Sequence, residues 1–228
     1  MSLILARLLH KGAEKPSMLL RRDYLELCLL QNGKSNTTKF VQGAIKKIKK
    51  DIIFFFNEQQ QTKVIFSDEV DEQQNITEDN VCFVTPIEGV TNFSRALPFF
   101  AFVIFLQKIS PKGENVQACL IDFPALNHTC YAVSREGTWI KDTAHDCFTR
   151  VYCPQFTKID TPISCTNEYK MPPKGITELN VGSATYCIWA LISNKVDMIH
   201  TKNMDLATKK SAQLLIQEYK KQYTREND

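Results

Sequence analysis

The chain has no apolar run long enough to cross a membrane as a helix. A membrane-spanning helix needs about 18 or more consecutive apolar residues, whereas the longest apolar run, LPFFAFVIFL at 97–106, has the length of a buried strand. The apolar start, MSLILARLLHKG, lacks a preceding basic stretch and a following small-residue cleavage site. We therefore expect neither a signal peptide nor a membrane segment.

The cysteines and histidines lack the spacing of a zinc site. None of the eight cysteines forms a C-x-x-C pair, and none has a histidine at metal-ligand spacing. Scattered cysteines in a chain of 228 residues indicate reduced, mostly buried thiols and a cytoplasmic protein. The histidines are dispersed too, and we assign no catalytic role to any of them: His10, His128, His145 and His200.

A strong charge of either sign is also missing. Lysine and arginine total 28 against 25 acidic residues, a net charge of +3, which does not indicate nucleic-acid binding without a concentrated patch. The basic clusters at 45–51 and 220–228 are typical of solvated helix faces. No internal repeat or low-complexity tract is present.

What is present is the composition of a globular domain, with 43% hydrophobic and 23% charged residues. Helical spacing predicts a helix over 18–31 and a second over 41–56. The second has lysines mostly opposite one apolar stripe, and that stripe comprises Val41, Ala44, Ile45, Ile48 and Ile52.

The remaining patterns predict an α/β protein of the α+β type. Strands are expected at 62–66, 81–84, 99–106, 115–123, 128–134 and 137–142, with an antiparallel hairpin at SREG. The run at 99–106 is apolar throughout, so both its faces should be covered. After a polar, proline-containing stretch at 153–175 come a helix at 182–193, a strand at 196–200 and a helix at 205–222. We predict a mostly antiparallel portion, 1–152, and a smaller α/β portion, 153–228, packed as one compact unit.

The segment TPIEGVTNF, 85–93, lies between two apolar runs and resembles a turn built to hold metal ions and a phosphate. It is similar to the DPxDGTTNF signature of the inositol monophosphatase family, Mg²⁺-dependent phosphomonoesterases. Further similar segments follow in family order: 21–44, IFSDEV at 65–70, 120–142, the Gly-Ser-Ala helix at 182–193, and MDLATKKSAQLLIQE at 204–218, which resembles the family's WDxAAG helix.

The resemblance implies the family's layered αβαβα sandwich, with the C-terminal end shortened because the chain stops about one helix after Asp205. It also implies a Mg²⁺ site, since this family uses clustered Mg²⁺ to neutralise the phosphate and lower the pKa of a water molecule. The implied metal ligands are Asp68, Glu69, the Ile87 carbonyl, Glu88 and Asp205, and the backbone of Gly89 and Val90 would bind phosphate.

Three family positions hold residues that cannot do the family's chemistry. Thr85 stands where the family has the carboxylate that bridges two metal ions, and Val90 where it has the water-activating threonine. Ile45 stands at the position of that threonine's partner aspartate. The resemblance therefore implies that no catalytic set is intact and that Mg²⁺ binding is impaired.

Two functions stay open on this sequence. One is a pseudo-phosphatase acting through protein contacts, as bacterial extragenic-suppressor members do in ribosomal RNA transcription with RNA polymerase and elongation factors; a homodimer is a further expected partner state. The alternative is an active Mg²⁺-dependent phosphomonoesterase acting on inositol monophosphate or another small phosphate ester.

Features of the site separate these two functions. A carboxylate that replaces the charge missing at Thr85, from Glu69 or Asp71, would favour the enzyme, whereas an apolar plug formed by Ile45 and Val90 would oppose it. The simpler expectation for the acids of the loop at 67–80 is solvent exposure. For Asp205 the simpler expectation is an N-cap of the last helix.

Overall fold

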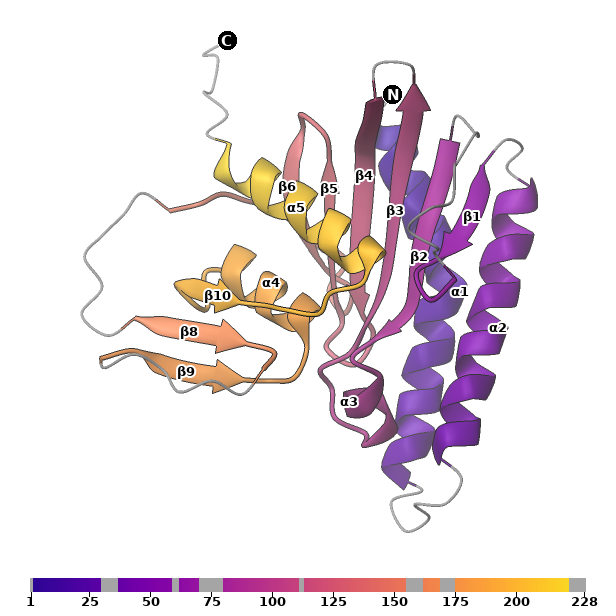
Figure 1. The fold of residues 1–228 in the computed structure, drawn as a ribbon, viewed down its shortest axis with the longest axis horizontal. Helices are drawn as coiled ribbons and strands as arrows, with labels where there is room; N and C mark the ends of the chain where they lie inside the picture. Colours follow the sequence, from indigo (N-terminus) through magenta and orange to yellow (C-terminus); the bar gives the residue numbers. More distant parts are fainter. Residues whose placement is uncertain are drawn as a thin grey trace.

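Two sheets and five helices make up the described part of the chain, shown in Figure 1. The computed structural model describes residues 2–29, 37–58, 62–69, 80–110, 113–154, 162–168 and 175–221. In chain order the elements are α1 (Ser2–Leu29), α2 (Thr37–Glu58), β1 (Lys63–Phe66), β2 (Asn80–Glu88), α3 (Val90–Ser94), β3 (Ala101–Ser110), β4 (Gly113–Phe123), β5 (His128–Val133), β6 (Gly137–Asp142), β7 (Cys147–Val151), β8 (Ile163–Thr166), β9 (Thr177–Asn180), α4 (Ala184–Ile192), β10 (Met198–His200) and α5 (Leu206–Lys220).

The large sheet has seven strands in sequence order, β1 to β7. Only the β1–β2 pair is parallel, so the predicted mostly antiparallel sheet is confirmed. The predicted hairpin is confirmed as well, because Val133 pairs with Gly137 across the SREG turn. The small sheet is parallel, with the order β10-β8-β9.

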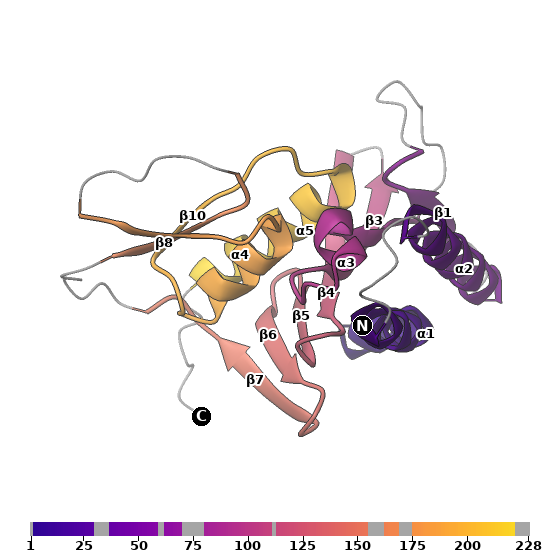
Figure 2. The ribbon, with the colours of Figure 1, turned by 90° about the horizontal axis from the view of Figure 1, so that it is seen from below.

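The layers follow from the two-residue period of the strands. On β3, Phe102 and Ile104 face a cluster that contains the helix residues Leu20 and Ile48, whereas Phe105 faces a second cluster that contains Leu215. Helices α1 and α2 therefore cover one face of the large sheet and α5 the other, with α4 and the small sheet beyond it (Figures 1 and 2). Both faces of the run at 99–106 are covered, as expected.

The helices α1 and α2, the large sheet, the helices α4 and α5, and the small sheet are four of the five layers expected. Within the described residues no helix covers the outer side of the small sheet. One hydrophobic cluster holds residues of β3, β4, α4 and α5, so the small C-terminal half shares a core with the large sheet. None of the helices in the described ranges is both long and apolar enough to span a membrane.

Helix α1 starts sixteen residues before the expected residue 18. The expectation was wrong because Gly12 and Pro16 interrupt the pattern and carry poor helix propensity. Packing outweighs that cost here. An added Cβ at Gly12 would lie 3.2 Å from Phe55 Cε1, so the glycine lets α2 approach α1 closely. Residues 30 and 31 of the predicted helix lie outside the described residues.

Several strands were missed or cut short by the sequence patterns. Strand β2 continues through Glu88 instead of ending at Val84, with a register shift between Thr85 and Glu88, so the expected turn at 85–88 is extended backbone. Strands β7, β8 and β9 were not predicted, and β8 lies inside the polar stretch at 153–175. The thiols match expectation, because all eight cysteines are free and five of them are buried.

Candidate functional site

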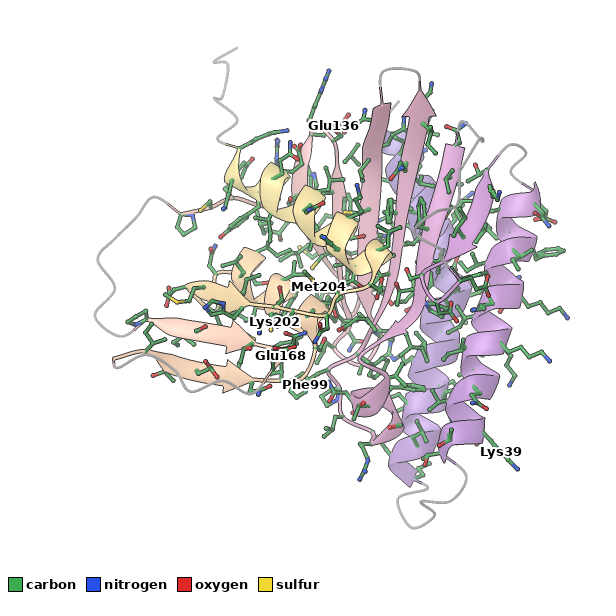
Figure 3. The ribbon with its side chains drawn as sticks, viewed as in Figure 1. Lys39, Phe99, Glu136, Glu168, Lys202 and Met204 are labelled. Atoms are coloured by element: carbon green, nitrogen blue, oxygen red, sulfur yellow. The ribbon has the colours of Figure 1, made fainter. Side chains whose placement is uncertain are left out.

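The candidate site lies where the C-terminal end of β2 meets the first residues of α4 and α5. Thr85 and Glu88 come from β2, Ser183 is the N-cap of α4, and Asp205 is the N-cap of α5. Figure 3 shows this meeting point near the labelled side chains of Met204, which precedes Asp205, and Phe99. The fold thus brings together three of the family-matched positions from segments far apart in the sequence.

Thr85 lies in a network of hydroxyl and carboxylate groups. Its hydroxyl donates a hydrogen bond to Asp205 Oδ1 at 2.6 Å, and its oxygen lies 3.0 Å from the Ser67 hydroxyl oxygen. Ser67 Oγ in turn accepts a hydrogen bond from the Ala207 amide at 3.3 Å. Where the family has a carboxylate that bridges metal ions, this chain therefore has a donor that serves another carboxylate.

Asp205 has partners for both carboxylate oxygens. Oδ1 accepts from the Thr208 amide at 3.0 Å as well as from Thr85, and Oδ2 accepts from the Thr208 hydroxyl at 2.9 Å. This is an N-cap, in which the carboxylate satisfies a free amide of the first turn and meets the positive end of the helix dipole. The expectation that Asp205 caps the last helix is confirmed.

Glu88 reaches across to the N-terminus of α4. Its Oε2 accepts from the hydroxyls of Ser183 at 2.7 Å and Thr185 at 2.5 Å, and its Oε1 accepts from the Ala184 amide at 3.0 Å. Burial raises the pKa of Glu88 above its ordinary value, and Asp205 raises it further, while the three hydrogen bonds oppose that shift. The carboxylate thus serves as an internal anion for a helix N-terminus.

Asp68 and Glu69 lie outside this network. Lys49 of α2 places its ammonium 2.7 Å from Asp68 Oδ2 and 2.6 Å from Glu69 Oε1. The same ammonium lies 4.8 Å from the centre of the Phe66 ring. The two acidic side chains are 60% and 57% exposed, which confirms the expected solvent exposure of these two acids.

The charge missing at Thr85 is not supplied by Glu69, because the partner of Thr85 is Asp205 and Glu69 bonds Lys49. The other residue proposed for that replacement, Asp71, lies outside the described residues. Lys49, Ser67, Ser183 and Thr185 are the partners that sequence reasoning missed.

Gly89 is held by backbone packing. Its φ of 76° lies in the left-handed region, and an added Cβ would lie 2.6 Å from the Phe99 carbonyl oxygen. Asn92 fixes the same turn, because its side-chain amide donates to the carbonyls of Phe99 at 2.7 Å and Val181 at 3.0 Å. The glycine is required by this fold, and phosphate binding at its backbone stays a prediction.

The three remaining predicted residues have different environments. Ile87 is buried, and Ile45 is partly buried against the cluster between α1, α2 and the large sheet. Val90, the first residue of α3, is 42% exposed. Ile45 therefore closes its part of the helical layer, but an apolar plug that includes Val90 is not formed.

The residues present do not fit a Mg²⁺ centre. Mg²⁺ needs octahedral oxygen ligands at about 2.0–2.1 Å, with carboxylates among them. Across the described ranges, no group of three or more His, Cys, Asp or Glu side chains is placed to hold a metal ion. The acids that the resemblance gathers around one centre are in two groups, each neutralised by protein donors: Glu88 and Asp205 by helix N-termini, Asp68 and Glu69 by Lys49.

Comparison with known proteins gives a distant sequence match and a clear structural one. No family model matches the chain. An inositol-1-monophosphatase of Caulobacter vibrioides is 25% identical over 130 residues, which is 57% of this chain and half of that protein.

Solved structures of this type match almost throughout. The extragenic suppressor protein SuhB of Bartonella henselae matches with a TM-score of 0.71 at 19% identity, covering 96% of this chain and 84% of that one. SuhB of Mycobacterium tuberculosis gives 0.74 at 12% identity, with 96% and 85% covered. Inositol monophosphatase II of Staphylococcus aureus gives 0.67 at 14%, with 92% and 79% covered. The chain therefore has the inositol monophosphatase and SuhB fold.

Proposed function

We propose that this inositol-monophosphatase-like protein is a catalytically impaired phosphatase that acts through contacts with other proteins. The observation that carries the proposal is the state of the acidic side chains at the candidate site. Glu88 accepts three hydrogen bonds, Asp205 caps α5, and Thr85 places a hydroxyl donor against Asp205. A metal ion would have to share these carboxylates with the donors that already hydrogen-bond them, or displace those donors.

The expected loss of activity is large. A positioned general base contributes roughly 10²–10⁴-fold to a reaction rate, and the positions matched to the family's water-activating pair hold Ile45 and Val90. Each hydrogen bond of a charged group that metal binding displaced would cost about a further 1.5–3 kcal/mol. Mg²⁺-dependent phosphate ester hydrolysis is therefore weak or absent in this proposal.

The proposed partners are RNA polymerase or its elongation factors. The resemblance to extragenic-suppressor proteins supports this choice, as does the structural similarity to two SuhB proteins. A homodimer is part of the same proposal. Binding of the full chain to purified RNA polymerase, with and without elongation factors, and its mass in solution test these two statements.

The test of impaired catalysis is phosphate release from inositol 1-phosphate with Mg²⁺ and with chelator. We expect the natural chain to match the rate without enzyme. A variant with Ile45→Asp, Thr85→Asp and Val90→Thr restores the family's residue types, and its control carries Ile45→Asn and Thr85→Asn with the same Val90→Thr. Activity in the aspartate variant alone would show that the fold supports the chemistry once the charges are present.

An active phosphomonoesterase is the second candidate. The observation in its favour is that Thr85, Glu88 and Asp205 converge at one place although up to 120 positions separate them in the sequence. Turnover by the natural chain that Mg²⁺ supports and chelator abolishes would establish this function and overturn the proposal above.

A further inference from the structure

Helix α1 has a solvent-facing stripe of apolar side chains interrupted by basic ones. Ile4, Met18, Leu25 and Leu29 are 69%, 67%, 55% and 88% exposed. Residues 4, 18 and 25 are separated by multiples of seven, which is close to a whole number of turns, and Leu29 follows one turn after Leu25. Lys11 at the same period and Arg22, about five turns after Ile4, lie on the same line along the helix, which is here called the outer stripe.

A second apolar stripe on the same helix already builds the core. Leu9, Ala13, Leu20 and Leu27 are buried against α2 and the large sheet. At about 100° per residue, the outer stripe lies on the opposite side of the helix from these residues. A helix that covers one face of a sheet needs a single apolar stripe, so the outer one has no role within the described part of this chain.

The surface beside the outer stripe is basic. Helices α1 and α2 lie side by side on the same face of the sheet (Figures 1 and 2). Lys15 of α1 lies 5.8 Å from the ring centre of the exposed Phe54 of α2. The outward lysines of α2 are Lys39, labelled in Figure 3, with Lys46, Lys47 and Lys50.

Counted over the described residues of α1 and α2, nine exposed lysines and arginines stand against three exposed acids, Glu14, Glu26 and Glu58. A partner surface that binds here should therefore carry a net negative charge.

We propose that the outer face of α1 and α2 binds an acidic amphipathic helix of another protein. Apolar residues of that helix, at a spacing of three and four, would lie along the outer stripe, and its carboxylates would face the lysines of α2. From Ile4 to Leu29 the stripe is roughly 37 Å long at 1.5 Å per residue, which matches a partner helix of about seven turns. The inference rests on the proposed function for its biological role, since it locates the protein contact that function needs.

A second copy of this chain fits the surface poorly. Two copies of α1 packed antiparallel about the middle of the outer stripe would bring Lys15 close to Lys15 and Glu14 close to Glu14. Like charges in contact are destabilising. The lysines of α2 would add repulsion between the two basic layers.

The test uses a fluorescent helical peptide of about 25 residues with leucine on one face and glutamate and glutamine on the other. We expect the full chain to bind it, with affinity that falls as salt rises. Met18→Glu with Leu25→Glu should weaken binding by at least about tenfold, and Lys46→Glu with Lys47→Glu and Lys50→Glu should do the same. Met18 and Leu25 are apolar and exposed, so the temperature of thermal unfolding should change little in the variant with Met18→Glu and Leu25→Glu.

Matched controls distinguish binding at the outer stripe from non-specific binding of the peptide. Leu179→Glu replaces an exposed leucine of β9 on the small sheet and should leave binding unchanged. A peptide with lysine in place of glutamate should not bind. The proposal is overturned if the acidic peptide fails to bind or binds the stripe variants equally well. It is also overturned if the stripe variants abolish a homodimer, since the occupant would then be a second copy. The same holds if the chain binds anionic lipid vesicles through the stripe and does not bind the peptide.

The fate of the proposed function is read separately. Stripe variants leave the candidate site untouched, so phosphate release from inositol 1-phosphate decides the catalytic proposal whatever the peptide does. A chain that binds the peptide and also hydrolyses the ester keeps this surface and loses the impaired-enzyme proposal. A chain that neither hydrolyses the ester nor binds the peptide keeps the impaired-enzyme proposal and loses this surface.

Discussion

The acids that follow β1 and those at the end of β2 and the start of α5 differ in how the protein neutralises them. Glu88 and Asp205, the inner pair, are partly buried, and amides at helix N-termini and hydroxyl groups hydrogen-bond them. Asp68 and Glu69 lie at the surface, where one ammonium group, that of Lys49, pairs with both. The family resemblance would place all four around shared metal ions. Here the inner pair belongs to the architecture and the outer pair to the solvated surface.

This difference sets the energies expected for each group. Removing an inner carboxylate leaves buried donors without a partner, which costs about 1–3 kcal/mol for each group left unsatisfied. An exposed ion pair contributes about 0–1 kcal/mol, because water and salt screen it. Substitutions should therefore separate the two groups in stability, whatever their effect on phosphate esters.

The largest effect should follow Glu88→Ala. The change removes the acceptor for two hydroxyls and one amide at the start of α4. The loss in the free energy of unfolding should be about 2–3 kcal/mol. It is not larger because the hydroxyl oxygens of Ser183 and Thr185 lie 3.0 Å apart, so the two hydroxyls can hydrogen-bond each other when the carboxylate is gone. Urea unfolding followed by circular dichroism measures it, with Glu88→Gln as the control of similar shape. A loss below about 0.5 kcal/mol, typical of surface sites, would contradict the internal-anion role of Glu88.

The pH dependence of the stability of Glu88→Gln, compared with the natural chain, tests the state of the Glu88 carboxyl group. Burial, with a smaller repulsion from Asp205, raises the pKa of Glu88 in the folded protein. The protonated form is thereby favoured in the fold. The part of the stability that depends on this titration is complete below the unfolded-state pKa of about 4.3 and is lost as pH rises through the raised folded-state pKa. The hydrogen bonds that the carboxylate accepts remain above that pH.

Glutamine does not titrate, so the stability of Glu88→Gln relative to the natural chain should rise with pH above about pH 4. The limit for one proton is about 1.4 kcal/mol per pH unit. Urea midpoints of both proteins across that range measure the difference. A relative stability that falls with rising pH would mean that the hydrogen bonds outweigh burial and that the pKa of Glu88 is lowered.

Much of the fold was predictable because its signals are local. Short runs bounded by turn residues mark β5 and β6, SREG marks their turn, and helical spacing marks α2 and α5. The N-cap role of Asp205 is also a local signal, since the acid directly precedes an apolar helical pattern. The start of α1 was not, because the packing of Gly12 against Phe55 is a tertiary contact that overrides a poor local propensity.

The partners of the site residues could not be predicted, because they come from remote segments. Glu88 and Thr185 are 97 positions apart, and Thr85 and Asp205 are 120 apart. Family similarity identified which positions matter and which residue types depart from the pattern. It gave no sign that Ser183, Thr185 and Lys49 would occupy the carboxylates. The fold shows that a hydrogen-bonded network joins Thr85 to Asp205 and that Glu88 is bonded at the start of α4.

The smallest effect should follow Lys49→Met, which keeps an unbranched apolar side chain and removes the ammonium that lies 4.8 Å from the centre of the Phe66 ring. The hydrogen bonds of Asp68 and Glu69 raise the pKa of Lys49 against the lowering effect of burial. The ammonium is therefore favoured in the fold, but its two partners are largely exposed. We expect a loss of less than about 1 kcal/mol at low salt, disappearing as salt rises. The natural chain and the methionine variant should also bind Mg²⁺ equally weakly in calorimetry, because freeing two exposed carboxylates does not bring Glu88 or Asp205 to them. Tight Mg²⁺ binding by Lys49→Met would instead make the lysine the group that occupies a metal site, and the outer and inner acids would then belong to one centre.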